Sequence, residues 1–496
     1  MKFPHFPMWR SIISNPRIHY LRMRVIIAGA GEIGRGVATA LRGEQRGVAL
    51  IDPDPNAISE SQSLDCLLVT GNALSRESLI RAGISDAEII VFATNDDHVN
   101  LLGCAFSKRV YSEQVGDRKA SGLITIAHVD DSNIMDPRRG AGPLEKWARS
   151  NFVVCPSEAI VDQLVAGLIA PSLDDILPLG DNAWIVVSEV TEASPLIGTT
   201  TGESMTIDGN HPMVPPIFAI RGRDGRDTLS SGNEIIQQGD HLLFVTGATK
   251  SFSNIALALG TPDSEMPVTP SVAIFGATRI GSRLARHYLD SGSNVVIIEP
   301  DLDSANEIVG STIGVNKRLD VIHGDPKDED LLRELAIENH DIAIATLGDD
   351  NLNISISMRT MDKGVLRTGL LLDDRALVEA IHRIGLRPVS KRRVAVTSIL
   401  KSIHMHVPGI YQRIPSMPSL VSISADIPSG NSLIGTLFSE VERKLGVNLA
   451  LVERIDEEGN PHARAPEHDQ TLEEGDRVFL FLEIDDLRKV EKSLGS

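Results

Sequence analysis

The chain has 496 residues, enough for three or four domains of about 150 residues each. Its formal net charge of −19 argues against a nucleic-acid-binding surface, which needs clustered lysine and arginine, and against direct adhesion to anionic lipid. Its three cysteines are too few and too scattered for a disulfide framework or a four-thiolate metal site, and no apolar run approaches the ~18 residues that a membrane-spanning helix needs.

Residues 1–22 form a basic leader with four lysine or arginine residues, no acid and no long apolar core. This composition makes a poor signal peptide. We expect a disordered tail, or an effective start of the protein at Met23. A membrane-touching arm is the alternative.

A dinucleotide fingerprint opens the first domain. The apolar run Val25–Ala28 predicts a buried parallel strand. Gly29, Gly31 and Gly34 follow it at the spacing G-x-G-x-x-G. The first glycine permits a tight turn, the second lets a pyrophosphate approach the backbone, and the third lets the helix pack on the strand.

The residues after the fingerprint complete the expected binding unit. A helix over residues 32–42 would point backbone N–H groups at a phosphate. Asp52 ends the next apolar run, residues 48–51, where its carboxylate can accept hydrogen bonds from ribose hydroxyls. The same carboxylate argues against NADP, because it would repel a 2′-phosphate.

Strand and helix signals continue to alternate, which predicts a doubly wound parallel sheet whose ligand lies beyond the carboxyl ends of the strands. The later strands are expected over residues 66–70, 89–93, 124–128 and 152–154. The loops Gly71–Ala73 and Thr94–Asp96 follow two of them and should wall the adenosine half of the site. Ordinary turn chemistry, without a ligand, is the alternative for both loops.

A smaller module follows. One helix, over residues 156–168, leaves the first domain, and the pattern then changes to short alternating strands. These strands are expected over residues 183–190, 217–221 and 241–245. Residues 261–270 contain three prolines and read as a linker.

The second half of the chain repeats the first. Val272–Gly281 resembles the opening fingerprint, and in both halves 23 residues separate the first glycine from the acid after the second strand (Gly29 to Asp52, Gly276 to Glu299). This repetition predicts duplication of a two-part unit, a doubly wound Rossmann-like domain and a small α+β lobe. We expect the domains at residues 23–170 and 271–404, with lobes at residues 180–260 and 418–494.

As a set, these motifs resemble the TrkA family of potassium-uptake proteins, which consist of two tandem RCK units. The resemblance covers residues 23–494 and includes the exit helix from Pro156 and the Leu-Ile-Gly and Gly-Asp turns of both lobes. It implies binding of NAD(H) and of adenine nucleotides such as ATP and ADP. It also implies a cytoplasmic homotetramer, peripheral on the inner face of the cell membrane, that docks on a TrkH-type potassium translocator.

The family pattern assigns nucleotide contacts by position. In the first half they fall on Gly29, Ala30, Gly31, Glu32, Ile33, Gly34, Asp52, Pro53, Asn72, Ala73, Thr94 and Asn95. In the second half they fall on Gly276, Thr278, Arg279, Ile280, Gly281, Glu299 and Asp325. Asn72 departs from the family's acid, which leaves adenine selectivity open. Thr278 replaces the second glycine and would crowd a pyrophosphate, so the second site is either a weak or mononucleotide site or purely structural.

No catalytic constellation accompanies these sites. The sequence contains neither the Tyr-x-x-x-Lys pair of short-chain dehydrogenases nor a glycine loop ending in Lys-Ser or Lys-Thr. The acid pairs Asp96-Asp97 and Asp349-Asp350 read as helix caps rather than a cation site. A regulatory sensor is therefore favoured. An NAD-dependent oxidoreductase with unrecognised catalytic residues and an RCK regulator of another cation transporter are the alternatives.

Overall fold

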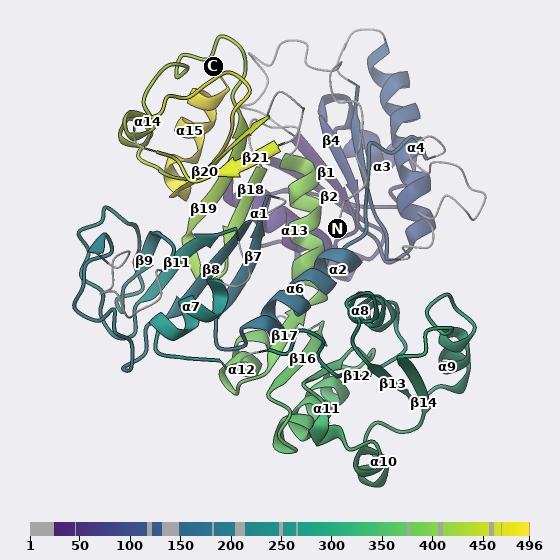
Figure 1. Ribbon diagram of the computed structural model, residues 1–496. Helices are drawn as coiled ribbons and strands as arrows, with labels where there is room; N and C mark the ends of the chain where they lie inside the picture. Colours follow the sequence, from purple (N-terminus) through teal and green to yellow (C-terminus); the bar gives the residue numbers. More distant parts are fainter. Residues whose placement is uncertain are drawn as a thin grey trace.

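The computed structural model describes most of the chain. The described residues are 24–44, 46–116, 122–130, 148–180, 183–203, 214–247, 251–263, 266–373, 377–404, 410–455, 461–467 and 469–495. They form four β-sheets, two parallel and two antiparallel, in the order parallel, antiparallel, parallel, antiparallel along the chain (Figure 1).

The first parallel sheet has six strands in the order β3-β2-β1-β4-β5-β6. Its elements are β1 (Arg24–Ala28), α1 (Glu32–Gly43), β2 (Gly47–Asp52), α2 (Pro55–Glu60), β3 (Leu67–Thr70), α3 (Arg76–Arg81), β4 (Ile89–Phe92), α4 (Asp97–Val115), β5 (Ile124–His128) and β6 (Phe152–Val154). The strand order reverses direction between β1 and β4, which is where open α/β sheets bind their ligands.

The second parallel sheet repeats this order as β14-β13-β12-β15-β16-β17. Its elements are β12 (Val272–Phe275), α8 (Arg279–Asp290), β13 (Val295–Glu299), α9 (Leu302–Val309), β14 (Leu319–His323), α10 (Glu329–Glu334), β15 (Ile342–Ala345), α11 (Asp350–Asp362), β16 (Arg367–Leu372), α12 (Leu377–Arg383) and β17 (Arg387–Ser390). The duplication and the two doubly wound domains that the sequence predicts are confirmed.

Each antiparallel sheet has five strands, in the orders β10-β9-β11-β8-β7 and β18-β19-β22-β20-β21. The first lobe consists of β7 (Asp175–Leu179), β8 (Ala183–Glu189), β9 (Ile217–Arg221), β10 (Asp227–Leu229), β11 (His241–Thr246) and α7 (Ser251–Ala258). The second consists of β18 (Ile410–Ile414), β19 (Met417–Asp426), α14 (Phe438–Leu445), β20 (Asn448–Ile455), β21 (Pro461–Arg464), β22 (Arg477–Glu483) and α15 (Leu487–Leu494).

Both antiparallel sheets begin earlier than the starts expected at residues 180 and 418. Strands β7 and β18 precede those positions and form sheet edges. Pro178 lies inside β7 and Pro415 directly follows β18. A proline weakens a strand prediction, yet an edge strand tolerates it because one row of its backbone groups needs no partner strand.

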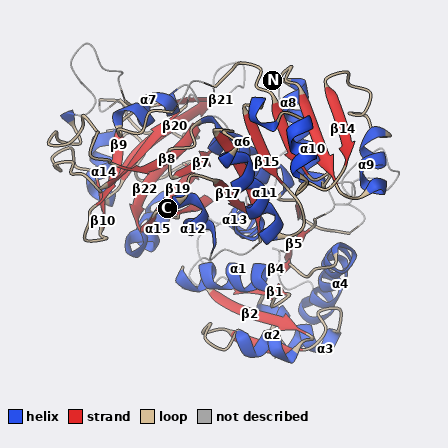
Figure 2. Ribbon diagram, turned by 90° about the horizontal axis from the view of Figure 1, so that it is seen from below, coloured by secondary structure: helices blue, strands red, loops and turns tan. Residues whose placement is uncertain are grey.

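The exit helices of the two halves cross over. α6 (Ser157–Ile169) follows the first sheet but packs on the second, where Leu164 and Leu168 join the core beside Leu284 of α8. α13 (Lys391–His404) follows the second sheet but packs on the first domain, as Figures 1 and 2 show. Each half therefore buries the apolar face of the other half's helix.

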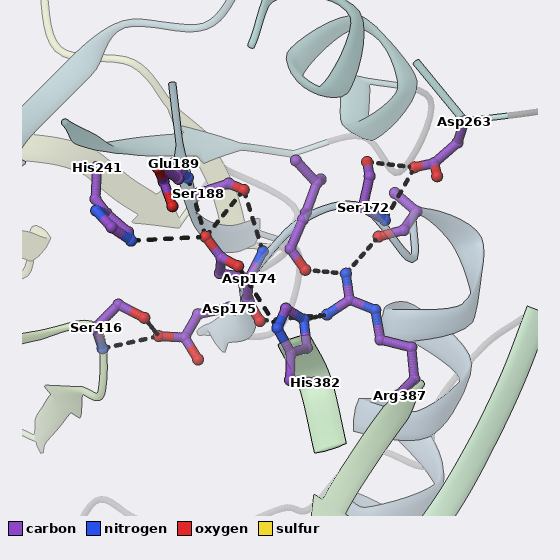
Figure 3. Close-up of polar contacts among 12 residues, drawn as sticks. Ser172, Asp174, Asp175, Ser188, Glu189, His241, Asp263, His382, Arg387 and Ser416 are labelled. Atoms are coloured by element: carbon purple, nitrogen blue, oxygen red, sulfur yellow. Dashed lines mark hydrogen bonds and ion pairs between the residues drawn. The ribbon is translucent and has the colours of Figure 1, made fainter. Parts of the chain in front are cut away.

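A buried arginine stabilises this exchange of exit helices (Figure 3). The guanidinium of Arg387, on β17, donates hydrogen bonds to the carbonyl oxygens of Ala170 (3.2 Å) and Leu173, just after the last turn of α6. A cation is favourable at the negative end of a helix dipole. Burial lowers the pKa of Arg387 to about 10, against the opposing effect of nearby acids that include Asp174, so this side chain remains charged at neutral pH.

His382 and two aspartates extend the junction. The Nε2 atom of His382 contacts the Arg387 guanidinium, which can only donate, so this nitrogen must be the unprotonated acceptor. Asp174 lies 3.6 Å from Nδ1 of His382 and accepts a bond from the hydroxyl of Ser188. The carboxylate of Asp175 accepts hydrogen bonds from Ser416, next to β18 of the second lobe, so the junction joins both lobes to the second parallel sheet (Figure 3).

We expect Arg387→Met to lower the free energy of unfolding by about 2–4 kcal/mol, because buried carbonyl groups would lose a charged donor. Chemical denaturation measures this change. Arg333→Met is the control, since Arg333 is 70% exposed in an ion pair with Asp330 and should change stability by less than about 1 kcal/mol. Equal effects of the two substitutions would contradict the role given to Arg387.

The junction should weaken in acid. Burial and the neighbouring Arg387 lower the pKa of His382 below its ordinary 6.5, although Asp174 and Asp175 oppose the shift. The unfolded chain then binds the extra proton first, so this contribution to stability is complete above about pH 6.5 and is lost as the pH falls below it. The melting temperature of His382→Gln should therefore fall less than that of the unchanged protein between pH 7.5 and 5. Parallel curves would exclude His382 as a source of the acid sensitivity.

Candidate nucleotide-binding site

The three glycines of the first fingerprint occupy different environments. Gly29 has a φ of +106°, and a Cβ atom there would lie 2.5 Å from the carbonyl oxygen of Ala93 on the neighbouring strand end. A Cβ on Gly34 would lie 1.8 Å from the carbonyl oxygen of Gly29. Gly31 differs, because a Cβ there would meet no atom within 4 Å. Two glycines thus permit close packing, and the third presents bare backbone to open space.

The helix that follows begins without a side-chain cap. Gly31 is the N-cap residue of α1, and no side chain accepts a hydrogen bond at this end. Glu32 is exposed, Ile33 is half-buried and Ala30 is buried beneath them. The uncapped N–H groups and the positive end of the helix dipole favour an anion at this position.

Asp52 holds the loop in place. One carboxylate oxygen accepts a hydrogen bond from the backbone N–H of Ala30 at 2.7 Å, and the other accepts from that of Asp54 at 2.8 Å. Pro53 is exposed between them. Each oxygen keeps a second lone pair for a ribose hydroxyl. The acid therefore connects the end of β2 to the phosphate loop.

The loop after β4 is fixed by a buried amide. Asn100, which is fully buried, donates from Nδ2 to the carbonyl oxygens of Thr94 and His128, both at 2.9 Å. Its Oδ1 atom accepts from the hydroxyl of Thr94 at 2.7 Å. Asn95 is exposed next to this anchor. Asn100 thus sets the ends of β4 and β5 relative to each other at the ligand-binding edge of the sheet.

The loop after β3 is an ordinary turn in this structure. The Oδ1 atom of Asn72 accepts from the backbone N–H of Leu74 at 2.8 Å, which is an Asx turn. Asn72 is exposed and Ala73 is buried. Both residues lie at a strand end of the same sheet edge as the phosphate loop, but the side chain of Asn72 bonds to its own loop.

His128 is the buried titratable group of this edge. It ends β5, is 2% exposed, and neither ring nitrogen has a hydrogen-bond partner among the described residues. Burial lowers the pKa of His128, while Asp130 and Asp97 act in the opposite direction. The ring is therefore neutral at pH 7.

The second fingerprint caps itself. The hydroxyl of Thr278 accepts a hydrogen bond from the backbone N–H of Gly281 at 3.1 Å, at the position where a phosphate would bind. The same hydroxyl bonds to that of Thr346 at 3.0 Å. Leu347 is buried beside the loop, where its side chain would lie 3.2 Å from a Cβ on Gly276. The predicted crowding by Thr278 is therefore joined by a competing hydrogen bond.

The remaining predicted residues of the second half lie around this loop without completing a site. Glu299 accepts from the backbone N–H groups of Ala277 (2.5 Å) and Asp301 (2.9 Å), as Asp52 does in the first half. Arg279 is exposed and Ile280 is buried. Asp325 accepts from the N–H of Lys327 within its own turn. The second half keeps the backbone geometry but fills the phosphate position.

The first aspartate of each pair caps the helix that follows, as predicted, whereas Asp97 and Asp350 accept hydrogen bonds from the backbone N–H groups of Asp130 and Asp373. Asp96 accepts from the N–H groups of His98 and Val99 at the start of α4, and Asp349 accepts from that of Leu352 at the start of α11. Across the described ranges, no group of three or more His, Cys, Asp or Glu side chains is arranged to hold a metal ion.

Comparison with known proteins shows which domain the two halves share and which proteins the chain resembles. The family model of the TrkA-N domain matches residues 25–135 and again residues 272–389. The "Trk system potassium uptake protein TrkA" of Azorhizobium caulinodans is 23% identical over 476 residues, which cover 95% of this chain and 98% of that protein. This chain therefore carries the TrkA-N domain twice and is similar to TrkA proteins over nearly its whole length.

Solved structures agree with the fold of this chain. The crystal structure of the GsuK RCK domain covers 96% of the chain with 95% of its own length, at a TM-score of 0.50 and 17% identity. The GsuK channel bound to NAD covers 96% of the chain with 79% of its own length, at a TM-score of 0.52 and 17% identity. Two tandem RCK units therefore describe the architecture. No helix in the described part of the chain is both long and apolar enough to span a membrane.

Two contributions to the site were not found from the sequence. Asn100 and Asn353 were not among the predicted site residues, yet both anchor strand-end loops, Asn353 through the carbonyl oxygens of Leu347 and Leu371. Arg392 lies far away in sequence and reaches Glu32 in the first fingerprint. Its one sequence signal is the run Lys391–Arg393 at the start of a helix.

The glycines should differ in their tolerance of a methyl group. We expect Gly34→Ala to cost about 3 kcal/mol of unfolding free energy, since its Cβ would overlap the carbonyl oxygen of Gly29. Gly31→Ala should leave stability unchanged within about 0.5 kcal/mol, because its Cβ meets open space at an ordinary φ of −66°. Chemical denaturation of both variants measures the difference, and a destabilised Gly31→Ala protein would contradict the open geometry.

Proposed function

We propose that this chain is the cytoplasmic regulatory subunit of a potassium uptake system. It binds NAD(H) or an adenine nucleotide in its first half and gates a TrkH-type membrane potassium translocator. It acts as a sensor and does not transform the nucleotide. In this proposal the chain assembles as a homotetramer, peripheral on the inner face of the cell membrane through its partner.

The observation that carries the proposal is the open phosphate loop of the first half. Gly31 leaves the backbone of the helix start accessible, no side chain caps that helix, and Asp52 stands where a ribose would lie. A related fold binds NAD in the GsuK channel. The match to TrkA along 95% of the chain supports potassium uptake as the process that the nucleotide controls.

The second half has a structural role in this proposal. Thr278 satisfies the N–H group that a phosphate would need, and Leu347 fills the space beside it. A ligand would have to break the threonine hydrogen bond and move a buried leucine before it gained any contact. One nucleotide per chain is therefore the expected stoichiometry, four per tetramer.

Regulation would follow from a difference in affinity between two arrangements of the ring. Shifting a gate from mostly closed to mostly open needs about 5 kcal/mol of differential binding, which four sites could share. The crossed helices α6 and α13 are suited to carry such a change, because each connects one half of the chain to the lobe that follows and packs on the other half. The same movement of α6 and α13 would regulate a different cation transporter if the chain docked on one.

Calorimetric titration with NAD, NADH, ADP and ATP tests the nucleotide site. We expect one site per chain, and we expect Asp52→Asn to weaken binding by about tenfold, because a charged acceptor for the ribose is lost. Glu299→Gln is the matched control in the self-capped half and should leave the affinity unchanged.

Four results would contradict parts of the proposal. If none of the four nucleotides binds, the chain is not a nucleotide sensor. Two sites per chain would contradict the structural role of the second half. Steady oxidation of NADH with a candidate substrate, followed by its absorbance, would favour an oxidoreductase. Failure to co-purify with a TrkH-type translocator, despite nucleotide binding, would favour another transport partner.

A further inference from the structure

Three consecutive cations begin α13. Lys391, Arg392 and Arg393 occupy the first turn of a helix of 14 residues. The N-terminal end of a helix carries a positive partial charge, so basic residues are unfavourable there unless acids compensate them. Each of the three forms an ion pair, and each acid comes from a different part of the molecule.

The other two cations, Lys391 and Arg393, pair with acids in the second half and in the first lobe. Lys391 pairs with Asp373, just after β16, at 3.0 Å. Arg393 lies 3.8 Å from Asp175 on β7, the aspartate that also accepts hydrogen bonds from Ser416. These two contacts fix the start of α13 without using the first parallel-sheet domain.

Arg392 instead reaches the first fingerprint. Its guanidinium contacts the carboxylate of Glu32, the first residue of α1 and the neighbour of Gly31. The two side chains are 38% and 53% exposed, so water competes with this pair. An exposed ion pair of this kind is weak, and a more highly charged phosphate can replace the carboxylate.

The packing of α13 holds Arg392 at this position. α1 and α13 run parallel and in register, with contacts at a constant separation of 360 residues in sequence. These contacts join Glu32 to Arg392, Gly36 to Val396 and Glu44 to His404. A Cβ on Gly36 would lie 2.7 Å from a methyl group of Val396, so the helices are close along their first turns. The start of α13 therefore lies beside the open phosphate loop.

The second half shows the opposite charge at the corresponding crossing. There α6 brings Glu158, which pairs with Arg283 of α8 at 2.9 Å. Thus the crossing helix supplies a cation beside the open loop and an anion near the self-capped loop. Two separate features therefore distinguish the halves. Both the Thr278 cap and the sign of the charge on the crossing helix favour a phosphate in the first half over one in the second.

We propose that Arg392 binds the terminal phosphate of the nucleotide held in the first half and releases Glu32 when it does so. This inference rests on the proposed nucleotide site. A planar guanidinium forms paired, charge-assisted hydrogen bonds with phosphate oxygens. The second half of the chain then completes the site of the first half. The site distinguishes nucleotides that carry a phosphate beyond the first, such as ADP and ATP, from AMP.

The same contact connects the ligand to the lobes. Arg393 follows Arg392 directly and pairs with Asp175 in the first lobe, while α13 continues toward the second lobe. At its far end, His404 bonds to Glu44 at 3.0 Å and stacks edge-on against Tyr411 of β18. A phosphate that binds Arg392 and moves its side chain therefore acts on a helix that contacts both lobes.

Calorimetric titration with AMP, ADP and ATP tests this inference. We expect Arg392→Gln to weaken ATP and ADP by about tenfold or more and AMP by less than threefold, since the lost interaction is a charge-assisted contact to the terminal phosphate. Arg393→Gln, one position along and paired with Asp175, is the matched control and should bind all three as the unchanged protein does. Arg392→Lys should recover only part of the lost affinity, because it keeps the charge but not the planar pair of donors.

Glu32→Gln provides a second, independent measurement. Removing the competing carboxylate should strengthen ATP binding severalfold, and this gain should vanish in the Glu32→Gln, Arg392→Gln double variant. Unchanged ADP and ATP affinity in Arg392→Gln, or an equal loss for AMP, would overturn the inference while leaving the nucleotide site intact. Absence of binding by the unchanged protein would instead overturn the proposed function itself.

Discussion

The parallel contact between α1 and α13 is the interaction on which the rest of the structure depends. It joins the first parallel sheet to a helix that follows the second one, through a shared core that contains Val37, Leu41, Ile399 and Ile403. α6 makes the reciprocal contact with the second sheet. Without these exchanges each half would expose an apolar helix face and an apolar sheet face, at a cost that grows with the area exposed. The two halves therefore form one structural unit.

The α1–α13 contact also places charged groups where the lobes meet the nucleotide-binding domain. At its far end Glu44 and His404 are both buried. Burial alone would raise the pKa of Glu44, but His404, Arg46 and Arg413 outweigh it and lower the pKa. Tyr411 donates a hydrogen bond to Glu491 in the same cluster. In the proposed sensor, this helix would connect the phosphate loop beside its first turn to the cluster at its last turn in the second lobe.

Duplication has kept the backbone of the two fingerprints and changed the chemistry around them. Gly29 and Gly276 share the left-handed backbone conformation, and Asp52 and Glu299 support their loops in the same way. The difference lies at Thr278, which supplies its own cap. Because an N–H group that is already bonded offers little to an anion, this one side chain is the basis for proposing a structural role for the second half.

The sequence by itself determined the duplicated doubly wound fold, because period, apolar runs and glycine spacing are local signals that survive without partners. It also determined that Thr278 would crowd a phosphate. Only the tertiary structure decided that the exit helices exchange between halves, that Arg387 caps α6 and that Arg392 lies beside Gly31. These contacts join residues more than 100 positions apart, and a pairing at that distance depends on how apolar faces pack, which no local pattern records.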